Sequence, residues 1–158
     1  EIVDGKSLVA LLTAVRRACR GLRLKVIVET GELADAALIR RACRIALDAG
    51  ADFLKTSTGK TRVSATLPAA RLLLEAIVAD PQARGRVGFK PAGGIRTVAD
   101  AAAYIELTRQ MLGSVTPDRL RIGASGLLND IEAVLGGGAG AAAPGAPGTP
   151  GALSLIHI

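Results

Sequence analysis

Three lysines stand at the positions where this sequence could do chemistry. Of 20 basic residues only five are lysine, and Lys55, Lys60 and Lys90 lie at or just beyond the ends of two apolar runs. Arginine keeps its proton in proteins, whereas a lysine amine in a dry pocket can lose it and attack a carbonyl carbon. The pattern therefore predicts a nucleophilic lysine with a second cation beside it.

Lys55 and Lys90 would be neighbours if the two apolar runs form adjacent strands. Repulsion between their ammonium groups would then lower the pKa of one of them and make it nucleophilic. For either lysine alone, a strand-end side chain that reaches for water is the plainer alternative. The glycine turns after both residues favour a shared site.

Glycine-rich turns follow the same strands. Gly59, the pair Gly93-Gly94, and the segment Gly123-Ala124-Ser125 could present backbone N–H groups and a helix N-terminus to a phosphate. Tight turns between strands and helices need such glycines too, so that alternative stays open. The segment 56–61, Thr-Ser-Thr-Gly-Lys-Thr, is not a P-loop, because the first glycine of that motif would fall at Leu54.

Short apolar strands alternate with helical patterns along the chain. We expect strands at 22–30, 51–57, 85–94 and 118–126, and helices at 6–20, 33–50, 67–80, 97–112 and 127–135. This alternation indicates a parallel sheet. Polar residues at several strand ends favour a (β/α)8 barrel over a doubly wound sheet. Since a whole barrel needs about 250 residues, we expect an α/β chain whose residues 1–135 hold about the last four βα units of a (β/α)8 TIM barrel.

Composition narrows the class of protein. The chain is 49% hydrophobic with a mean hydropathy of +0.37, which is typical of a globular core. Its net charge is +6, but the arginines are scattered and aromatic residues make up only 2%, so we expect no nucleic-acid partner. With no long apolar segment we expect no membrane partner. Cys19 and Cys43 have no metal-ligand spacing and favour free thiols in the cytoplasm.

The C-terminal residues differ from the rest of the chain. Residues 136–152 form a Gly/Ala/Pro tract that predicts a disordered tail. Residues 153–158, Leu-Ser-Leu-Ile-His-Ile, match what a sequencing-library adapter would encode, and we expect them to be an artefact; a short apolar strand is the alternative. His157 is the only histidine, so any proton transfer is expected to use Lys, Asp, Glu or water.

Four motifs together resemble the deoxyribose-phosphate aldolases. They are LKVIVETGEL, AGADFLKTSTGK, VGFKPAGGIRT and RIGAS, within residues 6–135. These are class I aldolases with a (β/α)8 barrel. The resemblance implies that Lys55 is the Schiff-base nucleophile and that Lys90 tunes it and assists proton transfer. It implies a sugar-phosphate site at Thr58, Gly59, Lys60, Gly93, Gly94, Gly123 and Ser125.

The implied reaction is the reversible cleavage of 2-deoxy-D-ribose 5-phosphate to D-glyceraldehyde 3-phosphate and acetaldehyde, with no metal or organic cofactor. Two departures bear on it: the family's proton-relay aspartate belongs to a strand before residue 1, and Gly126 stands where a second serine often follows. We therefore expect this chain to be an inactive fragment. Its unpaired sheet edges and apolar inner face would favour a homodimer or aggregation. A non-catalytic phosphate-binding barrel module is the alternative function.

Overall fold

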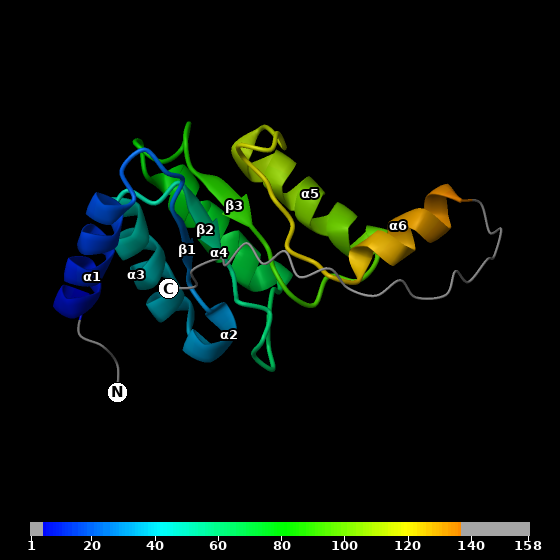
Figure 1. The fold of residues 1–158 in the computed structure, drawn as a ribbon, viewed down its shortest axis with the longest axis horizontal. Coiled ribbons are helices and arrows are strands. Elements are labelled where there is room, and N and C mark those ends of the chain that lie inside the picture. The colour runs from blue at the N-terminus through cyan, green and yellow to red at the C-terminus, as the bar shows by residue number, and fades with distance from the viewer. Residues whose placement is uncertain (1–4, 137–158) are drawn as a thin grey trace.

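Strands and helices alternate in the computed structural model, which describes residues 5–136 (Figure 1). The strands are β1 (Lys25–Ile27), β2 (Phe53–Lys55) and β3 (Gly88–Lys90). The helices are α1 (Gly5–Ala18), α2 (Thr30–Leu33), α3 (Ala36–Asp48), α4 (Leu67–Ala79), α5 (Val98–Leu112) and α6 (Leu127–Leu135). The predicted artefact at 153–158 and all of the predicted tail except Gly136 lie outside the described residues.

The three strands form one parallel sheet in the order β1-β2-β3. Lys25 pairs with Phe53 and Phe53 with Gly88, while Ile27 pairs with Lys55 and Lys55 with Lys90. Each crossover between strands contains a helix, as parallel pairing requires. The predicted α/β class with a parallel sheet is confirmed.

The segment predicted as a fourth strand runs beside β3 as two isolated parallel bridges. Phe89 bridges to Leu120, and Ala92 bridges to Gly123. Pro91 lies between the two bridges, and proline has no N–H to donate to a ladder. The predicted strand 118–126 is therefore shorter and less regular than its sequence pattern suggested.

One face of the sheet packs against the helices. Leu54 and Phe89 point into a core built from α3, α4 and α5, with Leu73, Leu74 and Ile77 fully buried in it. Figure 1 shows the helices following one another across the molecule, from α1 at one end to α6 at the other. Cys43 is also in this core, where burial raises the pKa of its thiol to about 12. It is a free thiol, as is Cys19.

The other face of the sheet carries cations around one aromatic ring. Alternation along the strands places Lys25, Phe53 and Lys55 on this side. The cationic groups of Arg23, Lys25 and Arg121 lie 5.9, 5.7 and 5.4 Å from the centre of the Phe53 ring. We expected this inner face of the sheet to be apolar. That prediction is wrong, because basic side chains surround Phe53, the aromatic residue of this face.

Short polar side chains cap the N-termini of α4 and α5, the helices that follow β2 and β3. Thr66 accepts a hydrogen bond from the Ala69 N–H at the start of α4, where Pro68 lies in the first turn. Thr97 and Asp100 form a capping box at the start of α5. Helix α2 was not predicted, since four residues are too few to show a helical period.

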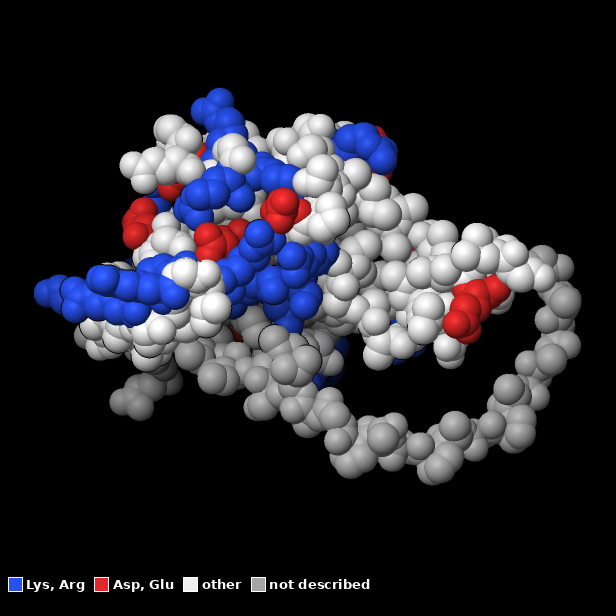
Figure 2. All heavy atoms as spheres, turned by 45° about the horizontal axis from the view of Figure 1, so that its top comes forward, with Lys and Arg blue, Asp and Glu red and all other residues white. Residues whose placement is uncertain are grey.

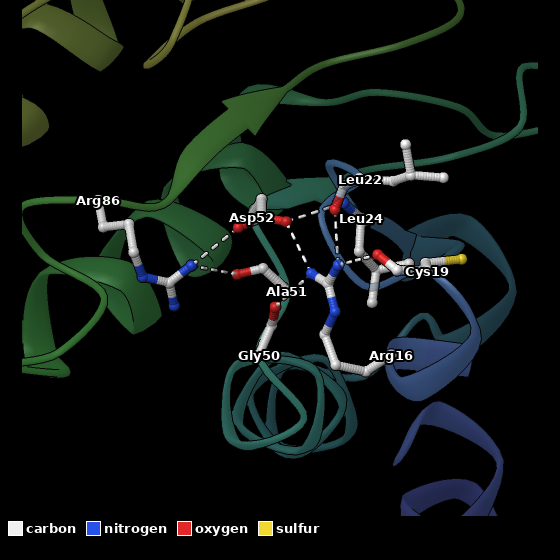
Figure 3. A network of polar contacts seen from close by, with 8 residues as sticks. All are labelled: Arg16, Cys19, Leu22, Leu24, Gly50, Ala51, Asp52 and Arg86. Carbon is white, nitrogen blue, oxygen red and sulfur yellow. Dashed lines mark hydrogen bonds and ion pairs between the residues drawn. The ribbon is translucent and has the colours of Figure 1, made fainter. Parts of the chain in front are cut away.

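Asp52 ties together three elements at the amino end of the sheet (Figure 3). Its Oδ2 accepts hydrogen bonds from Arg16 Nη1 at 2.9 Å and from the Leu24 N–H at 2.8 Å. Its Oδ1 accepts from Arg86 Nη1 at 3.0 Å. Arg16 also donates to the carbonyl oxygens of Cys19, Leu22 and Gly50. One carboxylate therefore fixes α1 and the entries to β1 and β3 around β2.

Basic side chains gather on one part of the surface (Figure 2). In that view they cover the region away from α6, with a few acidic side chains among them, while the end of the molecule bearing α6 is mostly uncharged. Among residues 5–136, no helix combines the length and hydropathy needed to cross a membrane.

Candidate functional site

The pairing register places Lys55 and Lys90 side by side at the carboxyl ends of β2 and β3. The Thr56 N–H donates to the Lys90 carbonyl oxygen at 3.1 Å, which continues the ladder one step past the two lysines. The Val28 N–H donates in the same way to the Lys55 carbonyl oxygen at 2.9 Å. The backbones of Lys55 and Lys90 are therefore held in place by hydrogen bonds to the neighbouring strands.

A cavity of about 600 Å³ opens beside these lysines. Such a volume suits a small-molecule ligand. Its lining includes eight of the nine predicted site residues: Lys55, Thr58, Gly59, Lys90, Gly93, Gly94, Gly123 and Ser125. The ninth, Lys60, lies on an exposed turn outside the lining, where its N–H donates to Thr58 Oγ1 at 3.2 Å.

Burial and a neighbouring charge lower the pKa of Lys55. Desolvation is the larger cause, and the cation of Lys90 is the next. The carboxylate of Glu29 acts in the opposite direction and favours the protonated amine. The direction agrees with the sequence argument, although burial contributes more than the predicted lysine–lysine repulsion.

The segment after Lys55 divides between structural and cavity-lining residues. Thr56 and Ser57 are fully buried and bond to the backbone of Ala92. The Ala92 N–H donates to Thr56 Oγ1 at 3.0 Å, and the Ser57 hydroxyl donates to the Ala92 carbonyl oxygen. These two side chains join the ends of β2 and β3, which leaves Thr58 and Gly59 to face the cavity.

Gly93 allows two of the glycine turns to touch. Its φ is +80°, and a Cβ built on it would lie 2.6 Å from Ser64 Oγ and 2.7 Å from the Gly59 Cα. Only glycine fits such a contact. The turn after β2 and the turn after β3 therefore form one continuous wall of the cavity.

The residues that line the cavity carry positive charge. Lys55, Lys90 and Arg96 are its ionisable lining residues. Sequence reasoning missed Arg96, although its place two residues after the Gly-Gly pair of the GFKPAGGIR motif was a usable signal. Ser125 and Gly126 bring the start of α6 to the same edge. An anion would meet side-chain cations and a helix N-terminus here.

The arrangement suits an amine that reacts with a carbonyl group beside an anion-binding edge. A lysine with a lowered pKa supplies more neutral amine at a given pH. Within residues 5–136, no cluster of three or more histidine, cysteine or acidic side chains is placed to hold a metal ion.

Comparisons with known proteins identify the family of this chain. The model of the DeoC/LacD family of aldolases matches residues 5–132. A deoxyribose-phosphate aldolase from Agrobacterium fabrum is 51% identical over 138 residues, covering 85% of this chain and 52% of that protein. The crystal structure of a protein from Toxoplasma gondii described as a putative deoxyribose-phosphate aldolase is 27% identical with a TM-score of 0.72, and covers 85% of this chain and 52% of that one.

An aldolase named QR15 is 31% identical with a TM-score of 0.62, covering 83% of this chain and 53% of that structure. The chain thus spans about half the length of the relatives that it matches.

Proposed function

Because the chain belongs to the DeoC/LacD family of aldolases, we propose that it carries the imine-forming lysine of a deoxyribose-phosphate aldolase. Lys55 is that lysine. The observation that supports this assignment most is that Lys55, whose pKa is lowered, lies opposite Lys90 in a cavity lined by cationic side chains. The substrate is 2-deoxy-D-ribose 5-phosphate in its open-chain aldehyde form.

The reaction begins when the neutral Lys55 amine adds to the aldehyde carbon C1. Loss of water together with uptake of one proton from solvent gives a protonated imine. The C2–C3 bond then breaks, because acetaldehyde takes two carbons and glyceraldehyde 3-phosphate takes three. The C3 hydroxyl proton passes to water beside Lys90, and the C2–C3 electron pair moves to the imine, which becomes an enamine. Protonation at C2 and hydrolysis of the imine release acetaldehyde and regenerate Lys55.

The phosphate group lies at the edge formed by the glycine turns in this proposal. Backbone groups of Gly93, Gly94 and Gly123 and the hydroxyl of Ser125 line that edge. Thr58 and Gly59 line the adjoining wall. Arg96 adds a cation that the sequence argument had not included. Lys60 reaches the phosphate from outside the cavity, as a charge on the exposed turn.

We propose that catalytic turnover requires more strands than the described sheet contains. The described residues contribute three strands and two further bridges, whereas a (β/α)8 barrel has eight strands. We propose that the chain by itself binds the sugar phosphate and forms the imine but completes few turnovers. A deoxyribose phosphate aldolase from Aeropyrum pernix is described as tetrameric, and we propose that this chain also self-associates. The free thiols of Cys19 and Cys43 fit a cytoplasmic location.

The competing function is a phosphate-binding module in which the lysines act only as charges. Lys55→Arg separates the two functions, because arginine keeps the cation and cannot form an imine. We expect Lys55→Arg to bind inorganic phosphate within about threefold of the parent chain, as measured by isothermal titration calorimetry, because the charge is unchanged.

The parent chain and the Lys55→Arg variant are then both treated with acetaldehyde and borohydride. The aldolase proposal predicts a mass gain on the parent chain and none at position 55 of the variant. Equal mass gains at other lysines in both proteins, with none at Lys55, would leave the binding module as the better account.

A further inference from the structure

Glu29 lies two residues after β1, directly before α2, in a backbone conformation that few residues adopt. Its φ and ψ are 55° and 59°, and within residues 5–136 only Ala34 is another non-glycine residue with positive φ. A side chain in the left-handed region carries a steric cost. Such residues persist where the surrounding structure holds them, and they concentrate at functional sites.

The Glu29 side chain reaches the turn that follows Lys55. Its Oε1 and Oε2 lie 3.3 and 3.1 Å from the Thr58 nitrogen, whose N–H they accept. Thr61 Oγ1 lies 3.3 Å from Oε1 and 2.8 Å from the Val63 carbonyl oxygen, so its single proton is shared between these two acceptors. The carboxylate therefore spans the turn at residues 58–61.

The backbone next to Glu29 supports the same loop. A Cβ on Gly31 would lie 2.0 Å from the Val63 carbonyl oxygen, so the start of α2 touches the loop directly. The Thr30 N–H donates to the Thr56 carbonyl oxygen at 2.9 Å. Residues 29–31 thus contact the chain after β2 at four residues, from Thr56 to Val63.

We propose that Glu29 is a positioning residue of this site: its carboxylate fixes the turn at residues 58–61 beside Lys55 and occupies the Thr58 N–H. This inference rests on the proposed function, in which Lys55 is the reacting amine. It has a consequence for the anion, because Thr58 then serves the cavity through its hydroxyl and not through its backbone. Glu29 also opposes the lowering of the Lys55 pKa, so it limits how readily the amine loses its proton.

Two variants of Glu29 and one control variant distinguish the effect of the carboxylate charge from the effect of the side-chain length. Glu29→Gln keeps the length of the side chain and removes the charge. Glu29→Asn removes the charge and shortens the reach, and asparagine tolerates the left-handed conformation better than most residues. Glu32→Gln is the control, since Glu32 is an exposed acidic residue in α2, the short helix that follows Glu29.

The first measurement is hydrogen exchange of the Thr58 amide in the full chain. We expect exchange about tenfold faster or more in Glu29→Asn, which corresponds to loss of one hydrogen bond to a charged group. Exchange should change little in Glu29→Gln and not at all in Glu32→Gln. The Leu54 and Phe89 amides in the core report whether each variant is folded. Unchanged Thr58 exchange in a folded Glu29→Asn variant would overturn the proposal.

The second measurement is the pH dependence of Lys55 labelling by acetic anhydride, read by peptide mass. Both Glu29 variants should move the labelling midpoint to lower pH, because a negative charge that favours the ammonium is gone, whereas Glu32→Gln should not. A midpoint that stays in place in both Glu29 variants contradicts the proposal. Neither measurement needs turnover, so they decide the role of Glu29 even if the parent chain forms no imine, a result that would reject the proposed function alone.

Discussion

Lys55 and Lys90 show how a residue pair obtains its chemistry from its surroundings. Both are lysines at equivalent positions of neighbouring strands. Burial lowers the pKa of Lys55 first, and the charge of Lys90 lowers it further. The effect of the Lys90 charge on the Lys55 pKa can be removed by one substitution at position 90.

Lys90→Met should raise the pKa of Lys55, because it removes a neighbouring cation that disfavours the ammonium form. Less neutral amine is then present at pH 7, so imine formation at Lys55 should be slower there and recover as the pH rises. The measurement is the pH dependence of acetic anhydride labelling at Lys55. Lys60→Met is the matched control, since Lys60 lies outside the cavity, and a shift of equal size in the control would contradict this account.

Gly93 and Gly94 form a natural pair for testing the wall of the cavity. Both have positive φ, at +80° and +78°, but a Cβ on Gly94 meets nothing closer than 3.9 Å. Gly94→Ala should therefore lower the free energy of unfolding by about 1–2 kcal/mol through backbone strain alone. Gly93→Ala adds the contact with Gly59 and Ser64 and should cost about 3 kcal/mol or more. Urea denaturation measures both, and equal losses would show that the two turns are not packed together.

At the scale of elements, Asp52 determines how β2 is joined to its neighbours. It accepts from Arg16, Arg86 and the Leu24 N–H, and its side chain is 29% exposed. Asp118 also pairs with an arginine, Arg23, but is 71% exposed. Partly buried hydrogen bonds to charged groups contribute more than exposed ion pairs do.

Asp52→Ala should therefore lower the free energy of unfolding by about 2–3 kcal/mol, because the Leu24 N–H and two guanidinium groups lose their acceptor. Asp118→Ala should cost less than about 1 kcal/mol. Chemical denaturation of the two variants in the same buffer makes the comparison. A larger loss for Asp118→Ala would show that the amino end of the sheet is held by other contacts.

The elements also show what could be predicted from the sequence and what could not. The three strands were found because short apolar runs alternate with helical patterns, and α4 and α5 because their apolar residues recur at helical spacing. Helix α2 was missed because it is shorter than a helical period can reveal. The contact between Arg16 and Asp52 joins residues 36 apart, and no local pattern reports it.

The candidate site divides in a similar way. Eight predicted residues line one cavity because strand ends in a parallel sheet meet at one edge. Lys60 was grouped with them by the family resemblance, yet it is exposed and does not line the cavity, although Thr58 and Gly59 of the same turn do. Glu29 was missed because a carboxylate that accepts from the backbone of another loop has no sequence signature.

At the scale of the whole molecule, charge opposes self-association through the cation-bearing face of the sheet. Arg23, Lys25 and Arg121 surround Phe53 there, and the chain carries a net charge of +6. Two copies meeting through this face would place like charges together. Salt screens such repulsion over about 10 Å at 0.1 M and about 3 Å at 1 M.

Self-association should therefore increase with ionic strength. We expect sedimentation velocity to show a larger average mass at 0.5 M than at 0.02 M sodium chloride. Arg121→Glu, which reverses one charge beside Phe53, should reduce this dependence. Association that weakens as salt is added would indicate an interface held by opposite charges at another surface.

The central claim is that Lys55 is the amine that forms an imine, and borohydride trapping tests it most directly. The full chain is incubated with acetaldehyde and reduced with borohydride, and the modified lysine is located by peptide mass. The account predicts an ethyl group on Lys55 well before any appears on the exposed Lys60, because burial and the charge of Lys90 lower the pKa of Lys55 and leave more neutral amine. Labelling of the exposed Lys60 ahead of Lys55 would contradict it.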